Sequence, residues 1–177
     1  MAQFVAFDTN VEVSGVSMLS VISAMGEKVK PALEKHGMGN LDPEKWYPIQ
    51  PYLDFYREIS ENRGYSIDLM KIGMMVPEKA TFPPDMVTIQ DAFTKLDEAY
   101  HLNHRGGDFG HYYANIVSPR QIDVIAHNPF PCDLDYGIVQ GLARRFRPAG
   151  ATVIVYHDAM KQCRKRGADR CTYHITW

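Results

Sequence analysis

The spacing of apolar residues changes once along this chain, near residue 108, and that change limits the folds open to it. Before this point apolar side chains recur every three or four residues, as Val16, Leu19 and Ile22 do, which is the spacing of one helix face. The pattern predicts helices over 14–36, 48–62, 65–76 and 84–103, with Pro31 kinking or ending the first one. We therefore expect residues 1–107 to be mainly helical.

After "HRGGDFG" the apolar period falls to two. Residues 111–117 and 121–127 flank the short "SPR" and predict an antiparallel hairpin. A helix follows Pro131, with acidic residues at its start and arginines at its end, and strands are expected at 151–157 and 171–177. The prediction is an α+β fold in one domain, 1–177, with a helical N-terminal half and a β-β-α-β-β antiparallel sheet over 108–177.

Composition and net charge limit what kinds of molecule this chain is expected to bind. The chain has 177 residues, of which 45% are hydrophobic, enough for one sizeable core. Its net charge of -2 argues against a nucleic-acid partner, because such domains are usually basic. No apolar run is long enough to span a membrane, and the start lacks the pattern of a secretory signal, so we expect a cytoplasmic protein that binds a small ligand or another protein.

The three cysteines are Cys132, Cys163 and Cys171. Cys132 opens the predicted helix, while a turn between two strands separates the other two. Three thiolates need one more ligand to complete a tetrahedral zinc site. His157 at the end of its strand is the first candidate and Asp158 the second; inert buried thiols are the alternative. The basic residues of "CRKRGADRC" are interpreted as a solvated loop face, with compensation of thiolate charge as the alternative.

Three segments carry a family resemblance: "NPFPCDLDYGIVQGLARRF", "VIVYH" and "CRKRGADRCTYHITW". Together they resemble the 4-vinyl reductase type of small-molecule-binding domain, which is related in architecture to haem nitric-oxide-binding (H-NOX) and TRAPP domains. The resemblance implies a zinc held by the cysteines and a glutamate three residues before Cys163. This chain has Met160 at that position, so the resemblance transfers the cysteines and leaves the fourth ligand open.

The same resemblance implies a ligand pocket between the helices and the sheet. Aromatic and methionine side chains are available to line it, although such residues on helices more often belong to the core. The candidates are Trp46, Tyr52, Phe55, Tyr56, Met70, Met74, Met75, Phe93 and Tyr100. We expect a small apolar or aromatic ligand.

The stretch "YHLNHRGGDFGHYY" places His101, His104 and His111 within eleven residues. His101 and His104 share a helix face if the helix extends that far, and both are candidates for ligand binding. In the related H-NOX domains the haem ligand comes from a helix just before the sheet, and by that resemblance His101 is the candidate axial ligand. The Tyr-x-Ser-x-Arg motif of those domains is absent from this sequence. Capping of a helix end is the alternative role of these histidines.

Two hypotheses about function follow. The first is a sensory or regulatory module that binds a small hydrophobic molecule, carries a structural zinc, and acts as a homodimer or on an output-domain partner protein. The second is a haem-binding gas sensor, or an enzyme of tetrapyrrole or hydrocarbon metabolism. The sequence contains no nucleophile elbow, phosphate loop or nucleotide fingerprint, so we name no catalytic residue and favour the first hypothesis.

Overall fold

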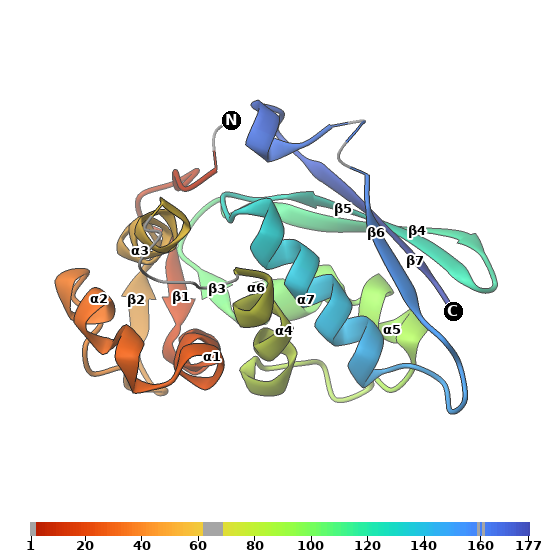
Figure 1. Ribbon diagram of the computed structural model, residues 1–177, viewed down its shortest axis with the longest axis horizontal. Coiled ribbons are helices and arrows are strands. Elements are labelled where there is room, and N and C mark those ends of the chain that lie inside the picture. The colour runs from red at the N-terminus through yellow and green to blue at the C-terminus, as the bar shows by residue number, and fades with distance from the viewer. Residues whose placement is uncertain (1–2, 62–68, 159, 161) are drawn as a thin grey trace.

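A computed structural model describes residues 3–61, 69–158, 160 and 162–177. The described chain forms two antiparallel sheets with helices packed beside and between them, so the predicted α+β class is confirmed (Figure 1). In the described part of the chain no helix has both the length and the apolar character needed to cross a membrane.

The N-terminal half contains a small sheet that the apolar pattern does not predict. Its strands are β1 (Glu12–Ser14), β2 (Trp46–Pro48) and β3 (His104–Arg105), in the order β2-β1-β3. Strands of two or three residues are too short to show a period of two. Through this sheet β3, which follows the fourth predicted helix, lies beside β1.

The first predicted helix is broken. α1 (Gly15–Met25) ends at Gly26, whose φ of 69° lies in the left-handed region that favours glycine. A short 3-10 turn (Glu27–Val29) leads into α2 (Lys30–Lys35). The prediction that Pro31 ends or kinks the helix is wrong, because Pro31 lies in the first turn of α2, where its missing N–H costs nothing.

The next helices follow the prediction with two corrections. α3 (Ile49–Glu61) and α4 (Leu69–Lys79) correspond to the helices expected at 48–62 and 65–76. Residues 62 and 65–68 of those two ranges lie outside the described residues. The predicted helix 84–103 is two helices, α5 (Ile89–Thr94) and α6 (Leu96–Leu102). It begins late because Thr88 and Asp91 form a capping box, which sets the helix start at Ile89.

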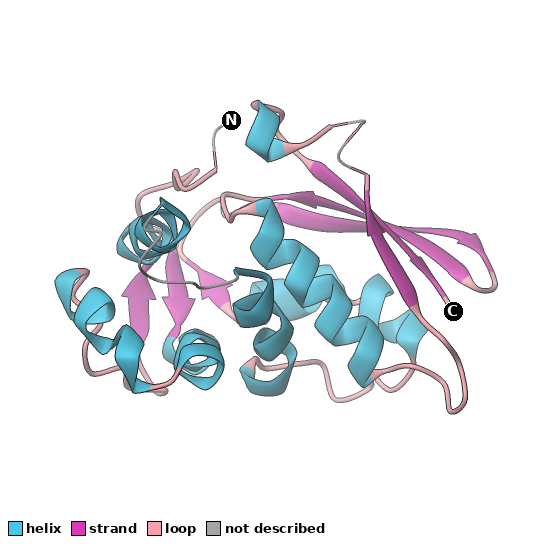
Figure 2. Cartoon of the chain, viewed as in Figure 1, coloured by secondary structure: helices cyan, strands magenta, loops and turns pink. Residues whose placement is uncertain are grey.

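The C-terminal half has the predicted order. β4 (His111–Ser118) and β5 (Gln121–His127) form the hairpin, α7 (Cys132–Arg145) follows, and β6 (Ile154–His157) and β7 (Cys171–Thr176) complete the sheet. The strand order is β4-β5-β7-β6, so β7 lies between β5 and β6. Figure 2 shows α7 running along one side of this sheet.

Close contact between α4 and α7 positions α7, the helix that starts with Cys132. Gly73 and Gly137 face each other where the two helices cross. A Cβ on Gly137 would lie 2.1 Å from the carbonyl oxygen of Met70, so only glycine allows this approach. Near the start of α7, Tyr173 of β7 donates a hydrogen bond to the carbonyl of Cys132 over 2.9 Å.

Candidate functional site

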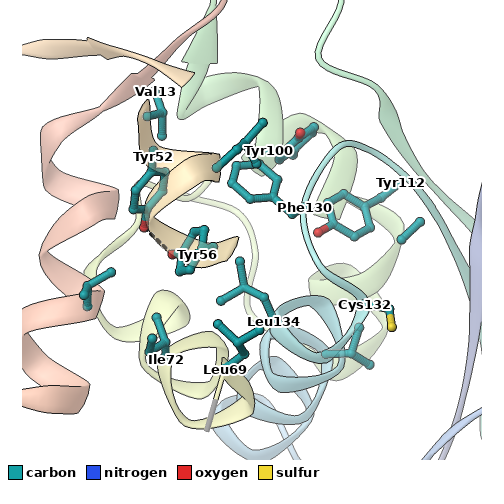
Figure 3. Close-up of a cluster of buried hydrophobic side chains, with 14 of the residues drawn as sticks. Val13, Tyr52, Tyr56, Leu69, Ile72, Tyr100, Tyr112, Phe130, Cys132 and Leu134 are labelled. Carbon is teal, nitrogen blue, oxygen red and sulfur yellow. Dashed lines mark hydrogen bonds between the residues drawn. The ribbon is translucent and has the colours of Figure 1, made fainter. Parts of the chain in front are cut away.

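A cavity of about 70 Å³ lies between the helices and the β1-β3 side of the fold. Its walls come from α1, α3, α4, α6, α7 and the strands β1, β3 and β4, and are mostly apolar. Figure 3 shows part of this region, where Tyr52 and Tyr56 share a hydrogen bond between their hydroxyl groups. The wall residues that carry the argument below are Tyr52, Tyr56, Tyr100, Asn103, His104, Tyr112, Phe130, Leu134 and Ile138.

His104 is a polar residue of this cavity with an unsatisfied ring nitrogen. Its Nδ1 donates to the backbone carbonyl of Tyr100 over 2.9 Å, which fixes the tautomer and leaves Nε2 as an acceptor. The side chain is 8% exposed, and Nε2 has no hydrogen-bond partner among the described residues. Burial lowers the pKa of His104 to about 4, so the ring is neutral near pH 7.

The neighbouring polar groups of the cavity have partners. The Tyr100 hydroxyl donates to the carbonyl of Phe109 over 2.7 Å. Asn103 accepts from the Ser17 hydroxyl over 2.6 Å and donates to the carbonyls of Ala99 and Thr81. An unpaired buried acceptor costs about 1–3 kcal/mol, so His104 stands out as a group that a ligand could satisfy.

The predicted ligand-binding residues fall into two groups. Tyr52, Tyr56, Tyr100 and His104 line the cavity, whereas the others do not. Phe55 and Phe93 are buried in the core, and Trp46 lies under the guanidinium of Arg105, 4.5 Å from its ring centre. Met74 lines a different groove, beside α7 and β6. Met70 and Met75 do not line the cavity either.

His101 also lies outside the cavity. Its side chain is 40% exposed, and its Nδ1 is 2.8 Å from the carbonyl oxygen of Asp97 on the preceding turn of α6. The helix ends at Leu102, so His104 belongs to β3 and faces the cavity, whereas His101 does not. The condition for a common face of these two histidines, a helix that extends to His104, is therefore not met.

The structure brings the three cysteines and His157 together. One ligand atom from each of the four residues lies within 4.8 Å of all the others. The sulfurs of Cys132 and Cys163 are 3.9 Å apart, close to the separation of about 3.8 Å between two thiolates bound to one tetrahedral zinc at about 2.3 Å. All three cysteines are buried and free of disulfides.

Of the two candidates for the fourth zinc ligand, His157 lies in the cysteine cluster and Asp158 does not. His157 Nε2 is buried in this cluster and has no hydrogen-bond partner among the described residues. Asp158 instead lies 3.3 Å from Nε2 of His174, whose Nδ1 is 2.7 Å from Asp123. Met160, where the resemblance implied a glutamate, is 79% exposed.

A buried ion pair joins the cysteine cluster to α7. Asp135, on α7, is fully buried and pairs with the guanidinium of Arg164, which is 3% exposed. Arg164 also directs its backbone N–H and its Nε to the sulfur of Cys171, over 3.4 and 3.5 Å. The interaction with Cys132, the nearby imidazole of His157 and these donors lower the pKa of Cys171. The prediction that the basic loop is a solvated face is therefore wrong for Arg164, whose position instead agrees with the alternative that these residues offset thiolate charge.

The same ion pair reaches the cavity. Tyr112 lines the cavity and donates its hydroxyl to Asp135 over 2.6 Å. Asn128 donates to the other oxygen of Asp135 over 3.1 Å and accepts from Arg164. A continuous set of contacts therefore runs from the cavity wall through Asp135 and Arg164 to Cys171.

Sequence reasoning misses this ion pair, although the sequence contains a signal for it. The charge pattern alone assigns Asp135 a favourable place near the helix N-terminus. Asp135 is also three residues after Cys132, so it lies on the same helix face as a buried thiol. A carboxylate on a buried face requires a cation, and that requirement points to one of the basic residues beside Cys163.

Comparison with known proteins supports the fold. No protein-family model matches the sequence, and no curated protein matches it. The structure is similar to an H-NOX protein from S. oneidensis in the Fe(II)NO ligation state, with a TM-score of 0.65 and 18% identity over 92% of this chain and 97% of that one. It is also similar to an oxygen-binding H-NOX domain related to soluble guanylate cyclases, with a TM-score of 0.65 and 15% identity over 92% and 91% of the two chains.

At these identities the comparison establishes an H-NOX-like fold. The architectural relation to H-NOX domains implied by the sequence is thereby confirmed. The narrower resemblance to 4-vinyl reductase and TRAPP domains stays a prediction.

We expect the replacement Asp135→Asn to destabilise the protein strongly. It leaves the Arg164 charge buried without its counter-ion, a change that typically costs about 3–5 kcal/mol. Asp133→Asn on the same helix breaks only the exposed pair with Lys165 and should cost less than about 1 kcal/mol. Urea unfolding of the two variants measures the difference; equal losses would contradict a structural role for the buried pair.

We expect His104 to make stability depend on acid pH. Its pKa of about 4 in the fold lies below the reference value of 6.5, so between these values the unfolded chain binds a proton that the fold does not. The free energy of unfolding should therefore decrease by up to about 3 kcal/mol as the pH falls from about 6.5 to 4. Unfolding curves of His104→Gln should lose this contribution, while those of His101→Gln, exposed on α6, should keep it.

Proposed function

We propose that this protein is a sensory domain whose cavity binds a small, largely apolar molecule that carries one hydrogen-bond donor. The observation that carries the proposal is the buried, neutral His104, whose Nε2 has no partner among the described residues. Apolar walls with a few placed polar groups are typical of small-molecule sites. A donor on the ligand would satisfy Nε2 without any change in protonation.

The size of the cavity limits the ligand. A water molecule takes about 30 Å³ in the liquid, and a cavity of about 150 Å³ holds benzene. The 70 Å³ available here suits a molecule of a few non-hydrogen atoms. An aromatic ligand would require the walls around Tyr52, Tyr56 and Phe130 to move apart.

Two isomers test the proposal, because 1-propanol and methoxyethane have the same atoms and only the alcohol has an O–H. NMR shifts of the Leu134 and Ile138 methyl groups should show tighter binding of 1-propanol by about 2- to 12-fold, the value of one hydrogen bond. His104→Leu should remove this preference, and His101→Leu should retain it. Equal affinity of the two isomers for the wild-type protein would reject a donor-recognising site.

We further propose that Cys132, Cys163, Cys171 and His157 hold a structural zinc. The sulfur spacing, the buried Nε2 of His157 and the thiolate-stabilising Arg164 fit such a site. The ion would connect the start of α7 to the ends of β6 and β7. Four protein ligands leave no position for a substrate, so this metal would brace the fold and would not catalyse a reaction.

Cobalt substitution tests the zinc proposal. We expect Co²⁺ to give the absorption of a tetrahedral thiolate site, and Cys163→Ser or His157→Ala to alter it and weaken metal retention by at least about tenfold. Asp158→Ala is the matched control, since its carboxylate lies beside His174 and outside the cluster. A spectrum altered by Asp158→Ala and unchanged by His157→Ala would identify the wrong fourth ligand.

Haem is the alternative occupant, suggested by the similar H-NOX structures, which are described in Fe(II)NO and oxygen-bound forms. Within the described lining the histidine is His104 and not His101, so His104 would be the axial ligand. The cavity is much smaller than a porphyrin, and among the described residues no lysine or arginine lines it to pair with the haem carboxylates. The residues in this arrangement do not fit haem, and a Soret band after addition of haemin would overturn that conclusion.

The remaining expectations stay predictions. They are the homodimer, the output-domain partner, the cytoplasmic location and the single domain over 1–177. We favour a binding role over catalysis because the described cavity wall presents a neutral acceptor without a paired acid and base.

A further inference from the structure

A second cluster of metal-binding side chains lies outside both the cavity and the cysteine cluster. It consists of Asp97 and His101 on α6 and His111 at the start of β4. One ligand atom from each residue lies within 4.8 Å of the other two. The chain between α6 and β4 folds back through Gly106, Gly107 and Gly110, all with positive φ, and so brings His111 beside His101.

The carboxylate of Asp97 is held in place between the two rings. Its Oδ1 accepts the backbone N–H of Tyr112 over 2.8 Å, and its Oδ2 faces the two imidazoles. Oδ2 lies 3.2 Å from Nδ1 of His111 and 3.6 Å from Nδ1 of His101. Ligand atoms bound to one zinc at about 2.0–2.2 Å are separated by roughly 3.3 Å, close to both of these spacings. To bind the ion through Nδ1, His101 would give up its present hydrogen bond to the backbone carbonyl of Asp97.

The exposure of the cluster suits an ion taken from solution. The side chains of His101 and His111 are 40% and 44% exposed, and Asp97 is 37% exposed. The ring centres of His101 and His111 are 5.0 Å apart. Two imidazoles and one carboxylate match the preference of zinc and its neighbours in the first transition row, and solvent can complete the coordination.

We propose that Asp97, His101 and His111 form a surface site for a divalent ion of the zinc class. The ion would join the last turn of α6 to the first residue of β4, across the segment 103–110. Phe109 of this segment packs against His101 and His104, with ring centres 4.7 and 5.3 Å away, so the site would also stiffen one side of the cavity. The proposal does not depend on the cavity ligand or on the cysteine zinc, because it uses none of their residues.

Paramagnetic NMR with Co²⁺ and untagged protein tests this site separately from the cysteine cluster. We expect Co²⁺ to broaden the amide signals of residues 97–112 as one group and those around Cys132, Cys163 and Cys171 as another. His101→Ala and His111→Ala should each raise the dissociation constant of the first group at least about tenfold and leave the second unchanged. His36→Ala, which removes a histidine outside the cluster, is the control and should change neither.

Hydrogen exchange provides a second readout. Saturation with Zn²⁺ should slow exchange of the amides of residues 105–110 in the wild-type protein and not in His111→Ala. The proposal fails if Co²⁺ does not broaden residues 97–112, or if both histidine variants bind there as tightly as the wild type. Those outcomes would leave Asp97 as a hydrogen-bond partner of the two rings only.

Discussion

The Asp135–Arg164 ion pair is the constraint on which the C-terminal half depends. Both charges are buried, and burying a charge is costly unless it is paired and hydrogen-bonded. The structure meets this requirement with Tyr112, Asn128 and the sulfur of Cys171 as further partners. The pair therefore fixes the loop before β7 against α7, and the cysteines take their positions from it.

α7 connects the two candidate sites. Its first residue is Cys132, and Leu134 and Ile138 farther along the helix line the cavity. Where α7 crosses α4, the two backbones approach so closely that only glycine fits at the contact. A ligand that shifts Tyr112 or α7 would also shift the Asp135–Arg164 pair, and Arg164 contacts Cys171. The fold therefore provides a physical route from the cavity to the cysteine cluster.

Periodicity predicts the elements that are long enough to show it. The hairpin and α3 appear where the apolar spacing places them, because each buries one regular face over several residues. α7 appears where Pro131 and the charges at its two ends predict it. The breaks at Gly26 and Lys95 and the sheet of β1, β2 and β3 escape this kind of prediction. Those features depend on local capping and on pairing between distant segments, neither of which leaves a periodic signal.

The sequence by itself determined the α+β order and the residue types for two kinds of site, a thiol cluster and a histidine-rich segment. Only the tertiary structure decided which members meet. His104 reaches the cavity and His101 does not, because α6 ends between them and the chain turns into β3. Arg164 is buried although Lys165 and Arg166 are exposed, because Asp135 on a separate element requires a partner. The physical reason is common to both: burial and pairing are properties of segments brought together by folding, and spacing along the chain does not specify them.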